Sequence, residues 1–224
     1  GLAMTADLAF HNGPNESTAL APATYAALDP NVSDPLVAAI EARLSQSRGQ
    51  GRRDRVELAA IDFHWPNVAM TRRWDHDLGY NPLRLALFTR ATGAGDHLAL
   101  ADQRQWAPAW PSYRSPFSDL IGLRWIVTAA PLSKLDRAIP DDAFPAVAKI
   151  GAATIYDRGE PAPRVLLATQ ALRVDFDALM ETGRWPAFDP RRTVLLDAVG
   201  ANGARATAPT PPGTARILAY RNAE

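Results

Sequence analysis

The sequence predicts an α+β fold in which helices flank a mixed β-sheet. In its first half, helix signals alternate with short apolar runs, as in strands joined by helical crossovers. Between residues 146 and 169 the connections are too short to hold a helix, so antiparallel hairpins are expected in the second half. A chain of 224 residues, 47% of them hydrophobic and 21% charged, is long and apolar enough to bury a sizeable core.

Four helices are indicated by capping residues, by proline and by glycine. Asp34, Asn81 and Ser115 each precede a proline, which is favoured at the first helical position because its φ is already set and its missing N–H is not needed there. Asp175 is a similar cap without proline. The expected helices are residues 35–48, 82–92, 116–121 and 176–182, the last three stopped by Gly93, Gly122 and Gly183, with Leu83, Ala86 and Leu87 of the second facing inward.

Short runs of β-branched, aromatic and aliphatic residues between these helices predict the strands. They cover residues 55–61, 123–128, 146–150, 153–157, 164–169, 193–196 and 216–220. Residues 45–53 and 201–213 combine small, polar and proline residues, so we expect them to be poorly ordered. We expect a single domain over residues 1–224, with a sub-boundary near 130–142 as an alternative to one continuous core.

The composition removes several classes of function. The 24 basic and 24 acidic residues cancel, so no overall field favours nucleic acid as a partner. The absence of cysteine excludes thiolate nucleophiles, cysteine zinc sites and disulfides. No apolar run is long enough to cross a membrane.

No motif in the sequence indicates a catalytic centre or a cofactor. The chain lacks the nucleophile elbow, the phosphate loop and the dinucleotide fingerprint. Acidic pairs such as Asp141 and Asp142 have two open interpretations, general acid and base or solvated surface. We therefore expect no catalytic residue and no cofactor in this chain.

A metal site is not expected either. The four histidines lack the spacing of a helical metal pair. Asp75, His76 and Asp77 form the one local cluster of potential ligands, but adjacent residues of an extended segment point to opposite sides. At most two of the three reach one ion, so a solvated loop is the expected structure.

The candidate ligand-binding site is the aromatic and amide-rich stretch over residues 65–81. Flat rings beside polar groups suit a sugar, which stacks on the rings and hydrogen-bonds through its hydroxyls. Tryptophan is more often buried, so the alternative is that the indoles fill the space between the sheet and the next helix. The expected contacts are Trp65, Asn67, Trp74, Asp75, His76 and Tyr80, with Asn81 ranked lower because it caps a helix.

Three further tryptophans have a similar ambiguity. Trp106 and Trp110 lie in the segment QWAPAWP, and Trp185 precedes Pro186. Each either covers the edge of the core or presents an apolar patch to a partner.

Three stretches together resemble one protein family. They are GYNPL at residues 79–83, LIGLRWIVT at residues 120–128, and IYDR at residues 155–158 followed by APRVLL at residues 162–167. Their order and spacing resemble the extracytoplasmic region of YfhO-type bacterial membrane proteins, over about residues 79–196. The chain departs from the family at Asp157 and Arg158, where an acidic residue and asparagine are usual, and at its C-terminus, where a further β-rich region is expected.

The resemblance implies a parent similar to lipid-dependent glycosyltransferases with many membrane spans, whose catalytic carboxylate lies in the membrane part. This chain is then expected to be a soluble, periplasmic domain at the outer face of the bacterial cytoplasmic membrane. A start at Gly1 rather than methionine agrees with a piece of a longer chain. The expected partners are the transmembrane part of the parent and a glycan or lipid-linked sugar.

Three functions remain open at this point. The first is a non-catalytic domain that binds or positions a sugar acceptor or a lipid-linked donor in cell-surface glycan assembly. The second is a protein–protein interaction domain of a membrane protein, with no ligand site. The third, an independent soluble hydrolase, lacks any supporting motif.

Overall fold

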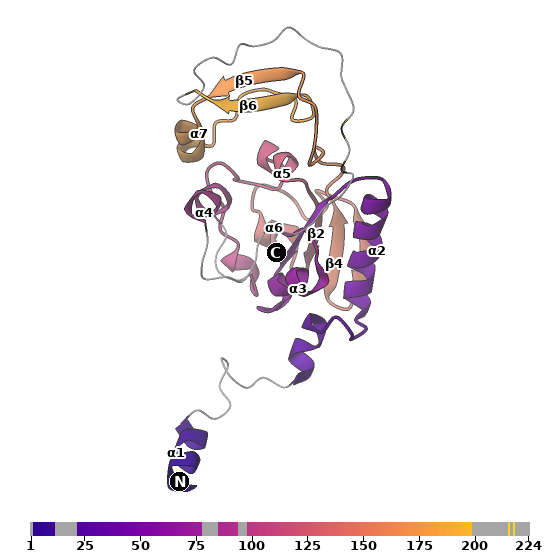
Figure 1. Ribbon diagram of the computed structural model, residues 1–224, viewed down its shortest axis with the longest axis vertical. Coiled ribbons are helices and arrows are strands. Elements are labelled where there is room, and N and C mark those ends of the chain that lie inside the picture. The colour runs from indigo at the N-terminus through magenta and orange to yellow at the C-terminus, as the bar shows by residue number, and fades with distance from the viewer. Residues whose placement is uncertain are drawn as a thin grey trace.

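The computed structural model describes residues 2–11, 22–77, 85–93, 98–198, 215 and 217, and it confirms an α+β fold with a mixed sheet (Figure 1). The elements are α1 Leu2–His11, η1 Pro22–Leu28, α2 Pro35–Gly49, β1 Arg55–Ala59, α3 Trp65–Arg72, α4 Ala86–Thr92, η2 Ala101–Gln103, α5 Pro116–Leu120, β2 Leu123–Thr128, α6 Leu132–Leu135, β3 Ala146–Ile150, β4 Ala153–Asp157, β5 Gln170–Val174, α7 Phe176–Thr182 and β6 Thr193–Asp197.

The main sheet has the strand order β1-β2-β4-β3. Strands β1 and β2 are parallel, whereas β2 and β4 and then β4 and β3 are antiparallel. A parallel bridge between Val56 and His76 extends the sheet beyond β1, so α3 forms the crossover between two parallel segments. The expected hairpin is confirmed for β3 and β4, which are joined through Gly151 at φ 59°.

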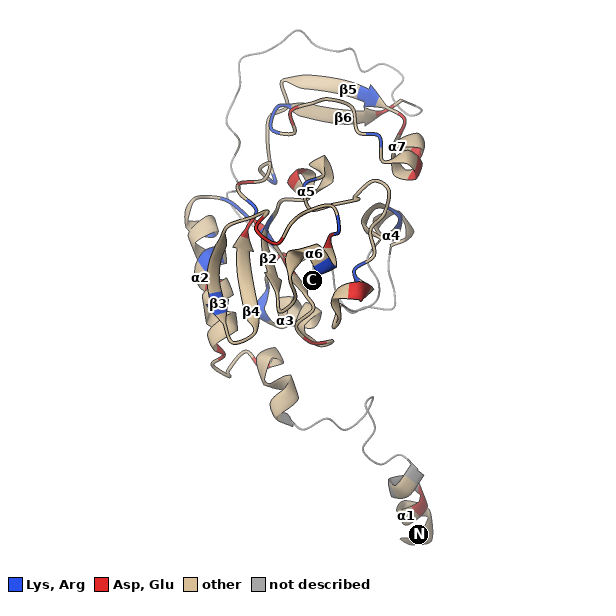
Figure 2. Ribbon diagram, turned by 180° about the vertical axis from the view of Figure 1, so that it is seen from behind, with Lys and Arg blue, Asp and Glu red and all other residues tan. Residues whose placement is uncertain are grey.

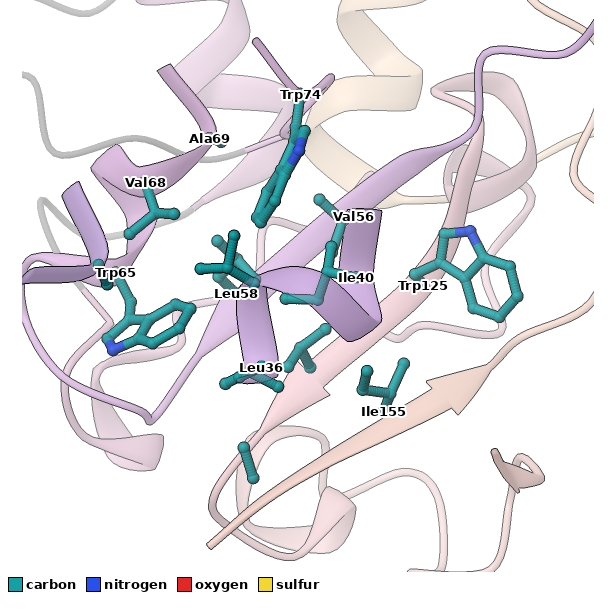
Figure 3. Close-up of a cluster of buried hydrophobic side chains, with 14 of the residues drawn as sticks. Leu36, Ile40, Val56, Leu58, Trp65, Val68, Ala69, Trp74, Trp125 and Ile155 are labelled. Carbon is teal, nitrogen blue, oxygen red and sulfur yellow. The ribbon is translucent and has the colours of Figure 1, made fainter. Parts of the chain in front are cut away.

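Two hydrophobic clusters cover opposite faces of this sheet. The first lies under α2 and α3 and includes Val56 and Leu58 of β1 (Figure 3). The second lies on the other face, where α5 and α6 pack, and includes Trp110 and Tyr113. Alternation along β1 therefore turns Glu57 away from the first cluster, toward Tyr113 of the second.

A second, smaller sheet lies beyond α5 (Figure 1). It pairs β5 with β6 in parallel, with α7 as the crossover between them. It is fastened to the main body where Trp185 Nε1 donates to the Ala109 carbonyl at 2.7 Å and where Arg90 pairs with Asp177 at 2.7 Å. The antiparallel hairpins expected in the second half are thus found for β3 and β4 but not for β5 and β6, because α7, at the expected residues 176–182, is long enough to act as a crossover.

The structure differs from the expected secondary structure in two segments, one before β5 and one at the end of α2. The strand expected at residues 164–169 does not form, and β5 begins only at Gln170. Val165 and Leu167 are exposed there, and the Arg164 side chain crosses back to the main body. Residues 45–49, expected to be irregular, form the end of α2, because Ser47 is buried and its hydroxyl donates to Asp54 at 2.8 Å.

The helix starts at Asp34, Ser115 and Asp175 are confirmed by side-chain hydrogen bonds to backbone N–H groups. Helix α4 ends at Gly93 as expected, yet Ala86 is exposed and Leu87 is 77% exposed instead of facing inward. Residues 82–84, the loop at 201–213 and the strand expected at 216–220 lie outside the described residues, apart from residue 217. The stretch 130–142 contributes Leu132 and Leu135 to the second cluster.

Gly122 occupies a backbone conformation that disfavours other residues, with φ 77°. A Cβ there lies 3.1 Å from the Arg164 Cδ atom, so Gly122→Val combines a left-handed backbone with crowding. We expect this variant to lose about 1–2 kcal/mol of unfolding free energy in urea titrations followed by circular dichroism. Gly49→Val is the control, because a Cβ at Gly49 meets nothing within 4 Å, and an equal loss in both variants would contradict the special role of Gly122.

Candidate functional site

The structure packs two of the expected ligand-binding tryptophans into the core. Trp65 begins α3 and Trp74 follows it, and both belong to the first hydrophobic cluster between α3, α2 and the sheet (Figure 3). The Trp74 indole also donates to a carboxylate oxygen of Glu41. These contacts match the alternative in which the indoles fill the space beside the sheet.

Two of the other expected residues, Asp75 and His76, have partners within the protein. Asp75 forms a salt bridge with Arg53 at 2.7 Å. The His76 side chain, which is 5% exposed, accepts a hydrogen bond from the Leu58 N–H at 3.1 Å through Nε2. Asn67 is half-buried in the first turns of α3, a segment expected to be loop. Tyr80 lies outside the described residues. Asn67 and the pair Asp75 and His76 thus belong to different elements, and the ligand-binding role assigned to this loop stays a prediction.

Asp75, His76 and Asp77 do not converge on one point. Asp75 turns to Arg53, His76 turns to the backbone of β1, and Asp77 is buried within reach of Glu57. Across the part of the chain that the structure describes, no group of three or more potential ligands is placed to hold a metal ion.

The sequence interpretation did not anticipate a buried polar cluster of Glu57, Asp77, Arg104 and Tyr113. Glu57 Oε1 accepts from Arg104 Nε at 3.0 Å and from the Tyr113 hydroxyl, and the side chains of Glu57 and Arg104 are both 0% exposed. One sequence signal was present, since Glu57 lies within the otherwise apolar run VELAA, where a charge needs a partner.

Aromatic rings hold the guanidinium of Arg104 in place. Its central carbon lies 3.7 Å from the ring centroid of Trp106 and 4.6 Å from that of Trp110. The negative face of an aromatic ring attracts a cation, and more strongly where water is absent. The Arg104 guanidinium that pairs with Glu57 is therefore held in one position.

The buried polar cluster contains two carboxyl groups and one guanidinium. Burial raises the pKa of Glu57 to about 8, against the opposing effect of Arg104, and nearby Asp77 raises that pKa further. Burial likewise raises the pKa of Asp77. Because the two carboxyls act on each other, we infer that they titrate as a coupled pair. Since Glu57 is fully enclosed, the cluster is a structural element of the core.

A large hollow lies beside this cluster and has the character of a ligand site. Its volume is about 910 Å³, and η2 with the residues after it forms one wall while residues 133–138 form the other. Trp106 lines it, and the Trp106 indole N–H donates to the Leu135 carbonyl at 2.8 Å, which fixes the ring. We call it the Trp106 hollow.

The rim of the Trp106 hollow carries exposed polar side chains. Lys134 and Arg137 line it and form no salt bridge within the described residues, and Asp102 adds an exposed carboxylate. Asp136 also lines it, but this buried carboxylate already accepts from the Ser112 hydroxyl at 2.6 Å and from the Tyr113 N–H at 2.8 Å. An aromatic ring beside exposed donors and one exposed acceptor is a mixture that suits a sugar.

Only one of the two tryptophans in QWAPAWP lines this hollow. Trp110 is fully buried and donates to the Ser118 hydroxyl at 2.8 Å, so it belongs to the core. Trp106 is half-buried. The sequence left both interpretations open for both residues, and the difference depends on tertiary packing.

A second pocket, of about 590 Å³, lies between α5, residues 164–168, α7 and β6. We call it the Trp185 pocket. Its lining is almost wholly apolar, including Phe117, Leu120 and Phe176. In contrast to this apolar pocket, the end of the main sheet nearest α5 carries charged side chains (Figure 2). Among them, Arg124 forms an ion pair with Asp157 at 3.0 Å.

Comparison with protein-family models, with curated proteins and with solved structures finds no match to the chain. Each helix in the described part of the chain is too short or too polar to cross a lipid bilayer.

Proposed function

We propose that the chain is a non-catalytic, extracytoplasmic domain of a membrane glycosyltransferase-like protein that binds or positions a sugar acceptor or a lipid-linked donor. The Trp106 hollow carries this proposal, because it combines a fixed indole with exposed donors and an acceptor in one concave surface. The resemblance of residues 79–196 to the YfhO-type region supports the membrane-linked part of the proposal.

The lining of the Trp106 hollow supports binding rather than catalysis. Glycoside hydrolysis usually needs two carboxyl groups that flank the scissile bond. Of the two carboxylates that line the hollow, Asp136 is buried and held by hydrogen bonds, which leaves Asp102 exposed. The carboxyl with a pKa raised to about 8, Glu57, is enclosed in the core.

The test is calorimetric titration with a panel of glucose, galactose and N-acetylglucosamine oligosaccharides. We expect at least one of them to bind, and Trp106→Leu to weaken that binding about tenfold, because the indole face is lost. Trp185→Leu is the matched control, since Trp185 lines the other pocket, and it should bind as the parent does. Circular dichroism checks that both variants fold.

Equal binding by the parent and by a folded Trp106→Leu variant would contradict the site. If Asn67→Ala loses binding instead, the binding site lies in the stretch at residues 65–81. Failure of the parent to bind any oligosaccharide would favour the second candidate function, an interaction domain. The observation that favours this candidate is α4, where Leu85 and Leu87 are 80% and 77% exposed and so available to the transmembrane part of the parent.

A further inference from the structure

The Trp185 pocket is unlike the Trp106 hollow in its chemistry. Helix α5 contributes Phe117 and Leu120, α7 contributes Phe176 and Met180, and β6 contributes Val194. The volume of about 590 Å³ is within the range of small-molecule sites. Removing this apolar surface from water is favourable, so an apolar ligand has a driving force to enter.

The lining contains two polar side chains besides the indole of Trp185, and one of these two already has a partner. Thr193 donates its hydroxyl to Gln170 Oε1 at 3.2 Å. The indole N–H of Trp185 is likewise used, because it donates to the Ala109 carbonyl at 2.7 Å. Arg164 is the remaining polar side chain of the lining.

Arg164 has an incomplete set of partners. Its Nη1 is buried without a hydrogen bond, and the Asp75 Oδ1 atom is 3.8 Å away, beyond hydrogen-bond range. The other Asp75 oxygen is bonded to Arg53 at 2.7 Å. Asp75 is therefore committed to Arg53, which leaves the Nη1 atom of Arg164 without a hydrogen-bond acceptor among the described residues.

The position of Arg164 is set by packing. Its Cδ lies 3.1 Å from the place where a Cβ on Gly122 would stand, so the arginine stem lies against the glycine. A fixed guanidinium offers paired donors that match the oxygens of a carboxylate or a phosphate.

We propose that the Trp185 pocket binds a single-chain anionic amphiphile, with the hydrocarbon chain in the pocket and the carboxylate or phosphate on Arg164. A peptide fits less well, because its backbone N–H and C=O groups would meet a largely apolar lining whose other polar side chains, Thr193 and Trp185, are already bonded. This second site does not depend on sugar binding at the Trp106 hollow.

The proposal is tested by calorimetric titration with dodecanoate, dodecyl phosphate and dodecanol, each below the concentration at which it self-associates. We expect at least one anion to bind about tenfold more tightly than the alcohol. The ratio of the affinities for dodecanoate and dodecyl phosphate identifies the preferred head group. Arg164→Gln should lower the affinity for that anion about tenfold and leave dodecanol unchanged. Arg137→Gln, the same change at the Trp106 hollow, should leave all three unchanged.

A second variant tests the location of the chain. Val194 is 40% exposed, so Val194→Asp is tolerable for folding, and a charge inside the pocket should abolish binding of all three probes. The proposal is overturned if neither anion binds the folded parent, or if anion and alcohol bind equally and Arg164→Gln has no effect. Unchanged binding in folded Val194→Asp would also overturn it, because the chain would then lie elsewhere.

Discussion

Arg104→Met should lower the unfolding free energy by about 3–5 kcal/mol, a larger loss than that expected for Gly122→Val. Arg104 is the one guanidinium bonded to Glu57 within the described residues, and both side chains are 0% exposed. Removing it leaves Glu57 without its guanidinium partner, although Arg55 still acts on Asp77, and leaving a buried carboxyl unpaired costs more than the loss of the pair itself. Urea unfolding followed by circular dichroism measures the effect.

Arg90→Met is the matched control for this substitution. Arg90 pairs with Asp177 at 2.7 Å and with Glu181 at 3.3 Å, but its side chain is 38% exposed, so its loss should cost less than about 1 kcal/mol. Adding Glu57→Gln to Arg104→Met should recover part of the loss, because one carboxyl is then neutral. If Arg104→Met and Arg90→Met lose similar amounts of unfolding free energy, the buried pair contributes no more to stability than the exposed one.

The second large effect is a dependence of stability on pH. The pKa of Glu57 is raised by burial to about 8 in the folded protein, from 4.5 in the exposed group, so the folded state holds the proton more tightly than the unfolded state. The resulting stabilisation is complete below about pH 4.5 and is lost as the pH rises through about 8, with an upper limit of about 5 kcal/mol. The raised pKa of Asp77 acts in the same direction.

Glu57→Gln tests this assignment. Glutamine keeps an oxygen for the Tyr113 hydroxyl but cannot ionise, so the fall in unfolding free energy between about pH 5 and pH 8 should become much shallower. Asp141→Asn is the control, since the pKa of this exposed carboxyl is lowered by its hydrogen bonds to Ser133 and its titration lies below that window. If the unfolding free energy falls with pH as steeply in Glu57→Gln as in the parent, Glu57 is not the cause of that fall.

Local signals in the sequence were enough for several elements. The bounds of β2, β3 and β4 are those expected, because each is a run of strand-forming residues bounded by glycine, proline or aspartate. Helix ends at Gly93 and Gly183 were equally predictable, since both residues adopt the left-handed conformation that ends a helix.

Other elements depend on contacts that are distant in sequence. The apolar run at residues 164–169 meets no neighbouring strand within the described residues, whereas β5 at residues 170–174 pairs with β6 about twenty residues further on. Glu57 and Arg104 are 47 residues apart, so only the folded chain shows their pairing. The expected binding stretch at 65–81 was chosen for its aromatic content, which cannot distinguish a core indole such as Trp65 from a half-buried one such as Trp106.

The most direct test of the proposed glycan site is chemical-shift mapping by NMR of the parent chain, titrated with the oligosaccharide that binds most tightly. We predict that the amide shifts which change on binding cluster at residues 100–106 and 133–138, the two walls of the Trp106 hollow. The indole N–H of Trp106 should shift with them. Changes confined to residues 65–77, with residues 100–106 unaffected, would contradict the account and place the sugar on the other face of the main sheet.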